Sequence, residues 1–162
     1  MSILITAANH SSAHKLARLL NSPDVIFADY TDNSQLKYSG KRFITIPAGN
    51  SSSYAHELLT ICLNLKIEKI YPLYIDEMKA LSEAKQLFNE YGIKVIVPDM
   101  DHLENLGITA VPAKFEFLII ADSKIVAGNP TESLNLPEGL EAGIFWINFD
   151  QLNPVIKLFA IA

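Results

Sequence analysis

The sequence predicts an α/β fold in which a mainly parallel, Rossmann-like sheet lies between helices as a three-layer sandwich. In residues 1–98, short apolar runs alternate with segments of helical periodicity. The runs are almost continuously apolar, which is typical of strands covered by helices on both faces. Strands that alternate with helices form right-handed βαβ units, and the expected strand order is 3-2-1-4-5.

The predicted elements of this first part follow from local patterns. Strands are expected over 3–5, 25–28, 42–46, 69–71 and 94–97. Helices are expected over 13–20, 54–65 and 76–91, because apolar residues recur there at helical spacings. Ser11 or Ser12 is expected to cap the first helix and Asp76 the third. Residues 30–41 show no apolar period and are expected to form a loop.

After Pro98 the pattern changes to that of a small C-terminal α+β appendage. We expect a short helix over 101–106, a hairpin of 114–121 and 124–127, a strand over 143–149 and a terminal helix over 150–162. Alternation in the 143–149 strand places Trp146 opposite Phe145 and Ile147, where it can face an interface. We expect 1–98 and 99–162 to pack together as one unit.

Charge and cysteine content argue against several classes of function. The chain has 13 basic and 18 acidic residues, a net charge of -5. Nucleic acids and anionic membranes attract clustered Lys and Arg, so we expect neither as a partner. A lone cysteine, Cys62, allows no internal disulfide. No apolar run approaches the roughly 18 residues of a spanning helix, and no signal-peptide pattern is present, so a cytoplasmic location is expected.

An ordered series of segments resembles a known family. The series comprises Ile-Leu-Ile-Thr-Ala at 3–7, Val-Ile-Phe-Ala-Asp at 25–29, Arg-Phe-Ile-Thr-Ile-Pro at 42–47, and the stretches 54–62, 67–77 and 87–98. It resembles the pre-ATP-grasp domain at the front of carbamoyl-phosphate-synthase-like ATP-grasp ligases. The resemblance implies a Rossmann-like fold. It also argues against autonomous ligase activity, because the 64 residues after Pro98 are too few for an ATP-grasp domain. Ala7-Ala8-Asn9-His10 replaces the family's glycine-rich turn, so a phosphate contact there is not implied.

Polar candidates gather where the first, second and fourth strands end, beside the predicted switch point of the sheet. They are Asn9, His10, Ser11, Ser12, Asp29, Tyr74, Asp76 and Glu77. The first helix N-terminus suits an anion, and the position of Asp29 resembles that of the ribose-binding acid of dinucleotide folds. Asp76 and Glu77 suit an amine or a metal. The structural alternatives are helix capping, turn formation and acids that favour a first helical turn.

No catalytic motif is present, and the sequence predicts no reaction and no metal site. Our leading hypothesis is a non-catalytic, stand-alone pre-ATP-grasp-like module. It would bind or scaffold a separate ATP-grasp ligase, or form a homodimer. The alternative is a small nucleotide- or metabolite-binding protein or enzyme that uses the crevice between strands 1 and 4, with a nucleotide as its ligand. A third possibility is an evolutionary remnant whose only requirement is to oligomerise through its C-terminal tail.

Overall fold

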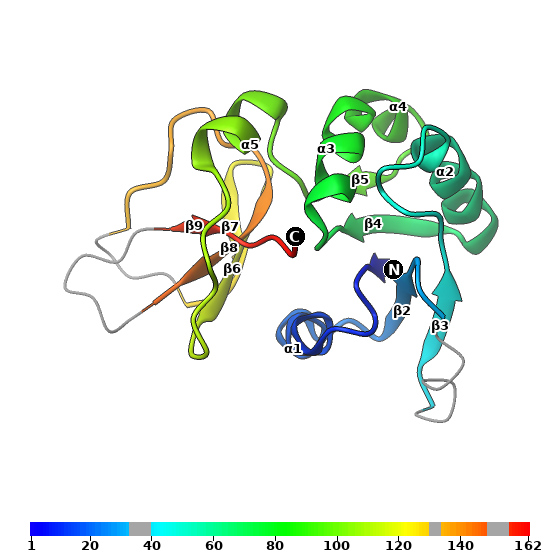
Figure 1. Ribbon diagram of the computed structural model, residues 1–162, viewed down its shortest axis with the longest axis horizontal. Helices are drawn as coiled ribbons and strands as arrows, with labels where there is room; N and C mark the ends of the chain where they lie inside the picture. The colour runs from blue at the N-terminus through cyan, green and yellow to red at the C-terminus, as the bar shows by residue number, and fades with distance from the viewer. Residues whose placement is uncertain (33–39, 130–133, 149–155) are drawn as a thin grey trace.

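The computed structural model describes residues 1–32, 40–129, 134–148 and 156–162 (Figure 1). Five parallel strands form one sheet in the order β3-β2-β1-β4-β5. Four further strands form an antiparallel sheet in the order β7-β6-β8-β9. The predicted fold class and the order of the parallel sheet are therefore confirmed. No helix in the described ranges is long and apolar enough to cross a membrane.

The parallel sheet forms from the apolar runs. Its strands are β1 (Ser2–Ile5), β2 (Asp24–Asp29), β3 (Arg42–Thr45), β4 (Ile67–Tyr71) and β5 (Lys94–Val95). Central β1 places Ile5 beside Phe27 of β2 and Tyr71 of β4. Leu4 and Ile5 are both fully buried, because β1 is covered on both faces.

Helices cover the two faces unequally (Figure 1). One face carries α1 (Ser11–Leu20), and the other carries α2 (Tyr54–Leu65), α3 (Ile75–Glu83) and α4 (Lys85–Glu90). Successive residues of β1 point alternately to the two faces of the sheet. Ile3 and Ile5 share a core cluster with Leu16 of α1, whereas Leu4 shares one with Leu58 of α2.

The expectation of one helix over 76–91 is wrong, because α3 and α4 are separate. Ala84 lies between them with φ -91 and ψ 5. The break redirects α4, on which Phe88 is fully buried. Alanine is the best helix former, so propensity gave no sign of the break.

The second sheet contains the predicted hairpin. Its strands are β6 (Glu116–Ala121), β7 (Lys124–Ala127), β8 (Gly143–Ile147) and β9 (Lys157–Leu158). Asp122 and Ser123 join β6 to β7 with φ 52 and φ 61, the left-handed pair of a tight hairpin turn. The terminal helix predicted over 150–162 is wrong for 156–162, where Leu158 of β9 pairs with Phe145. Residues 150–155 lie outside the described ranges.

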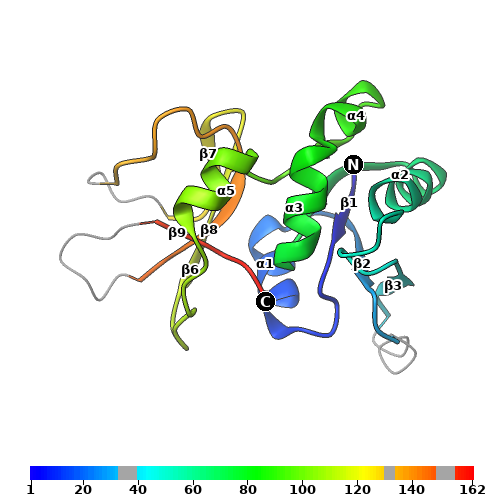
Figure 2. The same ribbon diagram turned by 45° about the horizontal axis from the view of Figure 1, so that its top comes forward.

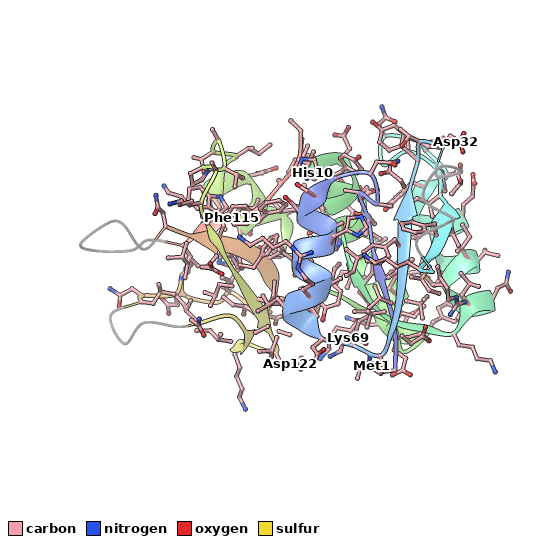
Figure 3. All side chains as sticks on the ribbon, turned by 90° about the horizontal axis from the view of Figure 1, so that it is seen from below. Met1, His10, Asp32, Lys69, Phe115 and Asp122 are labelled. Atoms are coloured by element: carbon pink, nitrogen blue, oxygen red, sulfur yellow. The ribbon has the colours of Figure 1, made fainter. Side chains whose placement is uncertain are left out.

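The second sheet packs between α5 (Met100–Leu106) and α1. On the α1 side, Phe117, Ile119 and Trp146 share a cluster with Leu16, and α1 lies between this sheet and the parallel strands (Figure 3). Trp146 is therefore 8% exposed. Trp146 packs against other parts of this protein, so it does not face a surface that a partner chain could contact.

A histidine joins α5 to the loop that precedes β8. Asp99 is the N-cap of α5 and accepts from the His102 amide over 2.9 Å. The His102 ring lies between two acceptors, with Nδ1 2.8 Å from Asp99 Oδ1 and Nε2 3.0 Å from the Glu138 carbonyl oxygen. Both ring nitrogens donate only when the imidazole is protonated, and the Asp99 hydrogen bond raises the pKa of His102.

Candidate functional site

The carboxyl ends of β1, β2 and β4 meet at one edge of the parallel sheet. The strand β2 lies on one side of β1 and β4 lies on the other, so the order of strands reverses direction at β1. This edge therefore holds the topological switch point where α/β proteins bind ligands. The segments 6–10, 30–32 and 72–74 follow these three strands. All eight residues singled out in the sequence belong to this edge or to the helices that start there.

The turn between β1 and α1 uses its backbone amides within the protein. The amides of Ala8 and His10 donate to backbone carbonyls over 3.0 and 2.8 Å. The amide of Asn9 donates to Asp29 Oδ2 over 3.0 Å. Nδ1 of His10 accepts from the Ser12 amide over 3.3 Å. A phosphate binds a helix N-terminus through free N–H groups, and these four are already bonded.

The predicted caps of α1 are wrong by one or two positions. His10 is the N-cap, and Ser11 and Ser12 are the first residues of the helix. An imidazole acceptor at His10 supplies the hydrogen bond that a serine hydroxyl was expected to make. Ala7 precedes this cap with φ 56, a left-handed conformation that costs a residue with a Cβ roughly 1–2 kcal/mol. The turn thus has a backbone conformation that favours glycine, although residues 7–10 include no glycine.

Asp29 connects the ends of β1, β2 and β4. Its side chain is fully buried. Besides Asn9, it accepts from the amide and hydroxyl of Thr31, each over 3.2 Å. The Tyr74 hydroxyl donates to it over 3.4 Å. Burial and the Asp29 charge raise the pKa of Tyr74. Both carboxylate oxygens are thereby committed to the protein.

Glu77 is fully buried in the first turn of α3. Neither carboxylate oxygen makes a hydrogen bond of ordinary geometry to a described residue. Burial raises the pKa of Glu77 to about 8, although the Thr6 hydroxyl and the Tyr74 amide act in the opposite direction. Gly49 packs against the backbone at the start of α3, since a Cβ there would lie 2.5 Å from the Glu77 backbone nitrogen. Glu77 is therefore a buried acid whose environment favours the neutral form.

Asp76 has a different environment from its neighbour. It is exposed in the first turn of α3. The prediction that it caps this helix is wrong, because Tyr74 occupies the N-cap position. An acid at the second helical position still interacts favourably with the helix dipole. The two adjacent carboxyls thus differ in exposure, because Asp76 faces solvent and Glu77 is buried.

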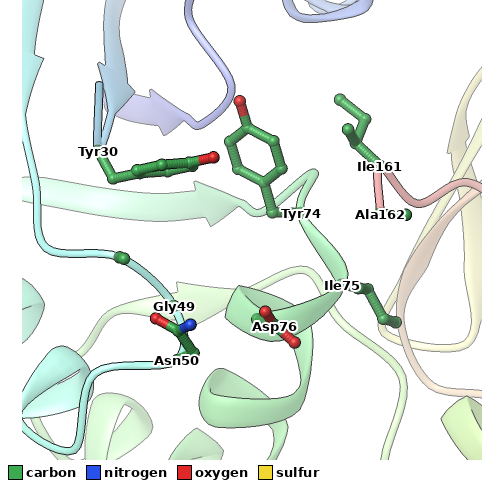
Figure 4. Close-up of a pocket in the computed structure, with 9 residues that line it drawn as sticks. Tyr30, Gly49, Asn50, Tyr74, Ile75, Asp76, Ile161 and Ala162 are labelled. Carbon is green, nitrogen blue, oxygen red and sulfur yellow. The ribbon is translucent and has the colours of Figure 1, made fainter. Parts of the chain in front are cut away.

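A hollow of about 140 Å³ opens at this edge between β2, the 46–50 loop and α3 (Figure 4). The Tyr30 and Tyr74 rings meet edge to face on one side, with centroids 5.3 Å apart. Asn50 and Asp76 lie on the opposite side in Figure 4. The hollow therefore combines aromatic surface with polar groups that point to solvent.

The segment 159–162 separates this hollow from a second one. The Ile161 amide donates to the Leu73 carbonyl over 2.7 Å, and the Ile75 amide donates to the Ile161 carbonyl over 2.9 Å. Figure 2 shows the chain passing from β9 to the start of α3. The second hollow lies beyond this segment, where His10, Ser11 and Ser12 face 111–113. The structure thus joins Asn9, Asp29 and Tyr74 by hydrogen bonds, whereas the start of α1 lines the second hollow at the same edge.

Sequence reasoning missed Tyr30, Asn50 and Ile161, which all line the first hollow. Tyr30 directly follows β2, so its position at a carboxyl end was a usable signal. Asn50 lies in the loop after β3 and gave a weaker signal of the same kind. Ile161 reaches the edge only through pairing of the tail with 73–75, which no local pattern reveals.

The described residues include no group of three or more His, Cys, Asp or Glu arranged to hold a metal ion. Asp29 and Glu77 are the buried acids of the edge. Asp29 accepts hydrogen bonds from protein donors, and Glu77 is fully buried. The described geometry therefore favours a role in holding the edge together for Asp29.

Comparison with known proteins bears on the resemblance seen in the sequence. A family model described as the PylC-like N-terminal domain matches residues 3–96. No curated protein matches the chain. The matched part contains the parallel sheet except for Ser2, the first residue of β1. The helix α5 and the antiparallel sheet follow it, and the 162 residues hold no ATP-grasp domain. The chain belongs to the family of PylC-like N-terminal domains, which are domains of the pre-ATP-grasp type.

Proposed function

We propose that the chain is a non-catalytic pre-ATP-grasp module that binds or scaffolds an ATP-grasp ligase carried on a separate chain. Family membership supports the module itself. The observation that carries the proposal is the β1–α1 turn, where the amides of Ala8, Asn9 and His10 already bond to the protein. A turn whose amides at 8–10 are already bonded supports a module that leaves the binding of ATP to its partner.

The small volume of the hollow at the carboxyl edge favours the same proposal. The hollow beside Tyr74 measures about 140 Å³, whereas small-molecule sites usually enclose roughly 300–1,000 Å³. Its rim carries Tyr30, which is 48% exposed, and the exposed polar groups of Asn50 and Asp76. An open rim of this kind suits a segment of a partner chain better than an enclosed nucleotide.

A small-metabolite binder is the second candidate. The edge-to-face pair of Tyr30 and Tyr74 lies across the hollow from Asp76. Aromatic rings next to an acid attract an amine through cation–π and ionic interactions. Such a ligand would be smaller than a nucleotide.

The test mixes the purified chain with an ATP-grasp ligase that lacks its own pre-ATP-grasp domain. Light scattering after gel filtration measures complex formation and self-association. Calorimetry with Mg-ATP, NAD and common amino acids measures binding by the chain alone. We expect a complex that Asp76→Arg weakens. Lys79→Glu, which reverses an exposed charge on the same helix, is the matched control.

Each outcome separates the hypotheses. A complex sensitive to Asp76→Arg alone supports the partner module. Saturable binding of a nucleotide by the isolated chain, lost in Ser11→Glu, contradicts it and supports the autonomous binder. A dimer that persists without the ligase supports self-association. Absence of any complex overturns the proposal.

A further inference from the structure

The described residues place no second helix beside α1 on its face of the parallel sheet, over β2 and β3. No described residue between Asp29 and Arg42 is helical, whereas connections between parallel strands usually contain a helix that covers the sheet. Side chains cover the sheet here instead. The His14 ring stacks on Phe27 at 4.6 Å, and Phe27 stacks on Phe43 at 5.4 Å. Figure 3 views the molecule from this side, with α1 in front of the strands.

A groove of about 360 Å³ follows this part of the sheet. Its floor includes Phe27, and its walls come from the C-terminal half of α1 and from 40–42. The groove shares no lining residue with the hollow at the carboxyl edge. Its volume lies within the range of small-molecule sites.

The groove is positively charged in a protein whose net charge is -5. Arg18, Lys41 and Arg42 line it, together with one acid, Asp24. Arg42 pairs with Asp24 over 3.1 Å. Arg18 and Lys41 form no ion pair with a described carboxylate. Two cations are therefore left to attract an anion.

His14 holds the Lys41 ammonium in place. Nε2 of His14 lies 2.8 Å from the Ala8 carbonyl oxygen, which fixes the N–H on that nitrogen. Nδ1 is left as an acceptor, and Lys41 Nζ donates to it over 3.2 Å. The same ammonium lies 5.4 Å from the centroid of Phe27. Fixing the ammonium in advance lowers the entropy that binding would cost.

We propose that this groove binds a small anion that carries phosphate groups, with Arg18 and Lys41 as its principal contacts. A guanidinium matches two phosphate oxygens at once, and an ammonium adds a point charge that tolerates several orientations. Two cations on one groove suit a ligand with two adjacent phosphates. The site is independent of the proposed partner function, because it lies on another surface.

The experiment titrates the full chain with inorganic pyrophosphate and follows heat and NMR shifts of the His14 ring. We expect saturable binding that Arg18→Gln/Lys41→Gln weakens by about tenfold or more. Lys79→Gln/Lys114→Gln removes the same charge from exposed positions elsewhere and should bind as the wild type does. Circular dichroism checks that each variant keeps the wild-type melting temperature.

Three results would overturn the proposal. One is the absence of saturation in the millimolar range. Another is an equal loss of affinity in both double variants, which indicates attraction by overall charge only. The third is equal affinity for citrate, which indicates a carboxylate or general anion and removes phosphate as the ligand class.

Discussion

Replacing Glu77 with glutamine is expected to remove a pH-dependent loss of stability. Burial raises the pKa of this fully enclosed carboxyl from the ordinary 4.5 to about 8. In the unfolded chain the carboxyl regains its ordinary pKa. Between these two values the folded state keeps a proton that the unfolded state has lost, so the free energy of unfolding falls as pH rises.

The size of the effect follows from the same two values. They differ by about 3.5 pH units, and each unit corresponds to about 1.36 kcal/mol. The wild type therefore loses about 5 kcal/mol of unfolding free energy through Glu77 between acid pH and a pH well above 8. Glutamine has nearly the same shape and stays neutral. Its advantage should grow to about 3 kcal/mol by pH 7 and level off above pH 8.

Urea unfolding from about pH 5 to about pH 9, followed by circular dichroism, measures this difference. Asp76→Asn removes one negative charge from the exposed neighbour in the same helical turn and is the matched control. We expect the Glu77→Gln curve to diverge from the wild type with rising pH. Equal pH dependence in the two variants would refute the argument that burial of Glu77 causes the loss.

Three further changes have defined outcomes. Ala7→Gly should cost about 1 kcal/mol less than Ala8→Gly in urea unfolding, because both methyls are buried but Ala7 alone has positive φ; equal costs would contradict strain at Ala7. His102→Ala should lose stability at low pH and approach the wild type as pH rises through the raised pKa of His102; a constant difference across pH would contradict the bridging imidazolium. Ile161→Pro removes the donor to the Leu73 carbonyl, and hydrogen exchange at the Ile75 amide should accelerate; unchanged protection would show that the tail does not hold α3.

The parallel sheet was predictable because its signals are local. Each strand is an apolar run that ends at a turn or proline, and the helices between them carry regular apolar spacing. The break at Ala84 and the extended tail were not predictable in this way. The tail is extended because Leu158 pairs with β8 and Ile161 with the segment after β4. Such pairing depends on partners far away in the sequence.

At the carboxyl edge, the positions of the residues were predictable from local signals, but their burial and hydrogen bonds were not. Tyr74 and Asp76 line the hollow because they follow a parallel strand, and this rule also applies to Tyr30. The place of Asp29 at this edge was predictable because it ends β2. Its four hydrogen-bond donors were not, because they come together only where three strand ends converge. The burial of Glu77 has no local signal, since its helix spacing equally suits an exposed acid of a first turn.

The tail makes the edge a fixed surface. Three backbone hydrogen bonds attach 159–161 to β8, to Leu73 and to Ile75, and each is worth about 1 kcal/mol net. Phe159 is 1% exposed, and burying such a side chain adds about 2 kcal/mol or more. The sum is a large part of the roughly 5–15 kcal/mol that stabilises a typical domain. Opening the edge therefore costs much of the fold's stability. A partner should meet the rim of Tyr30, Asn50 and Asp76 already formed, as a scaffolding module requires.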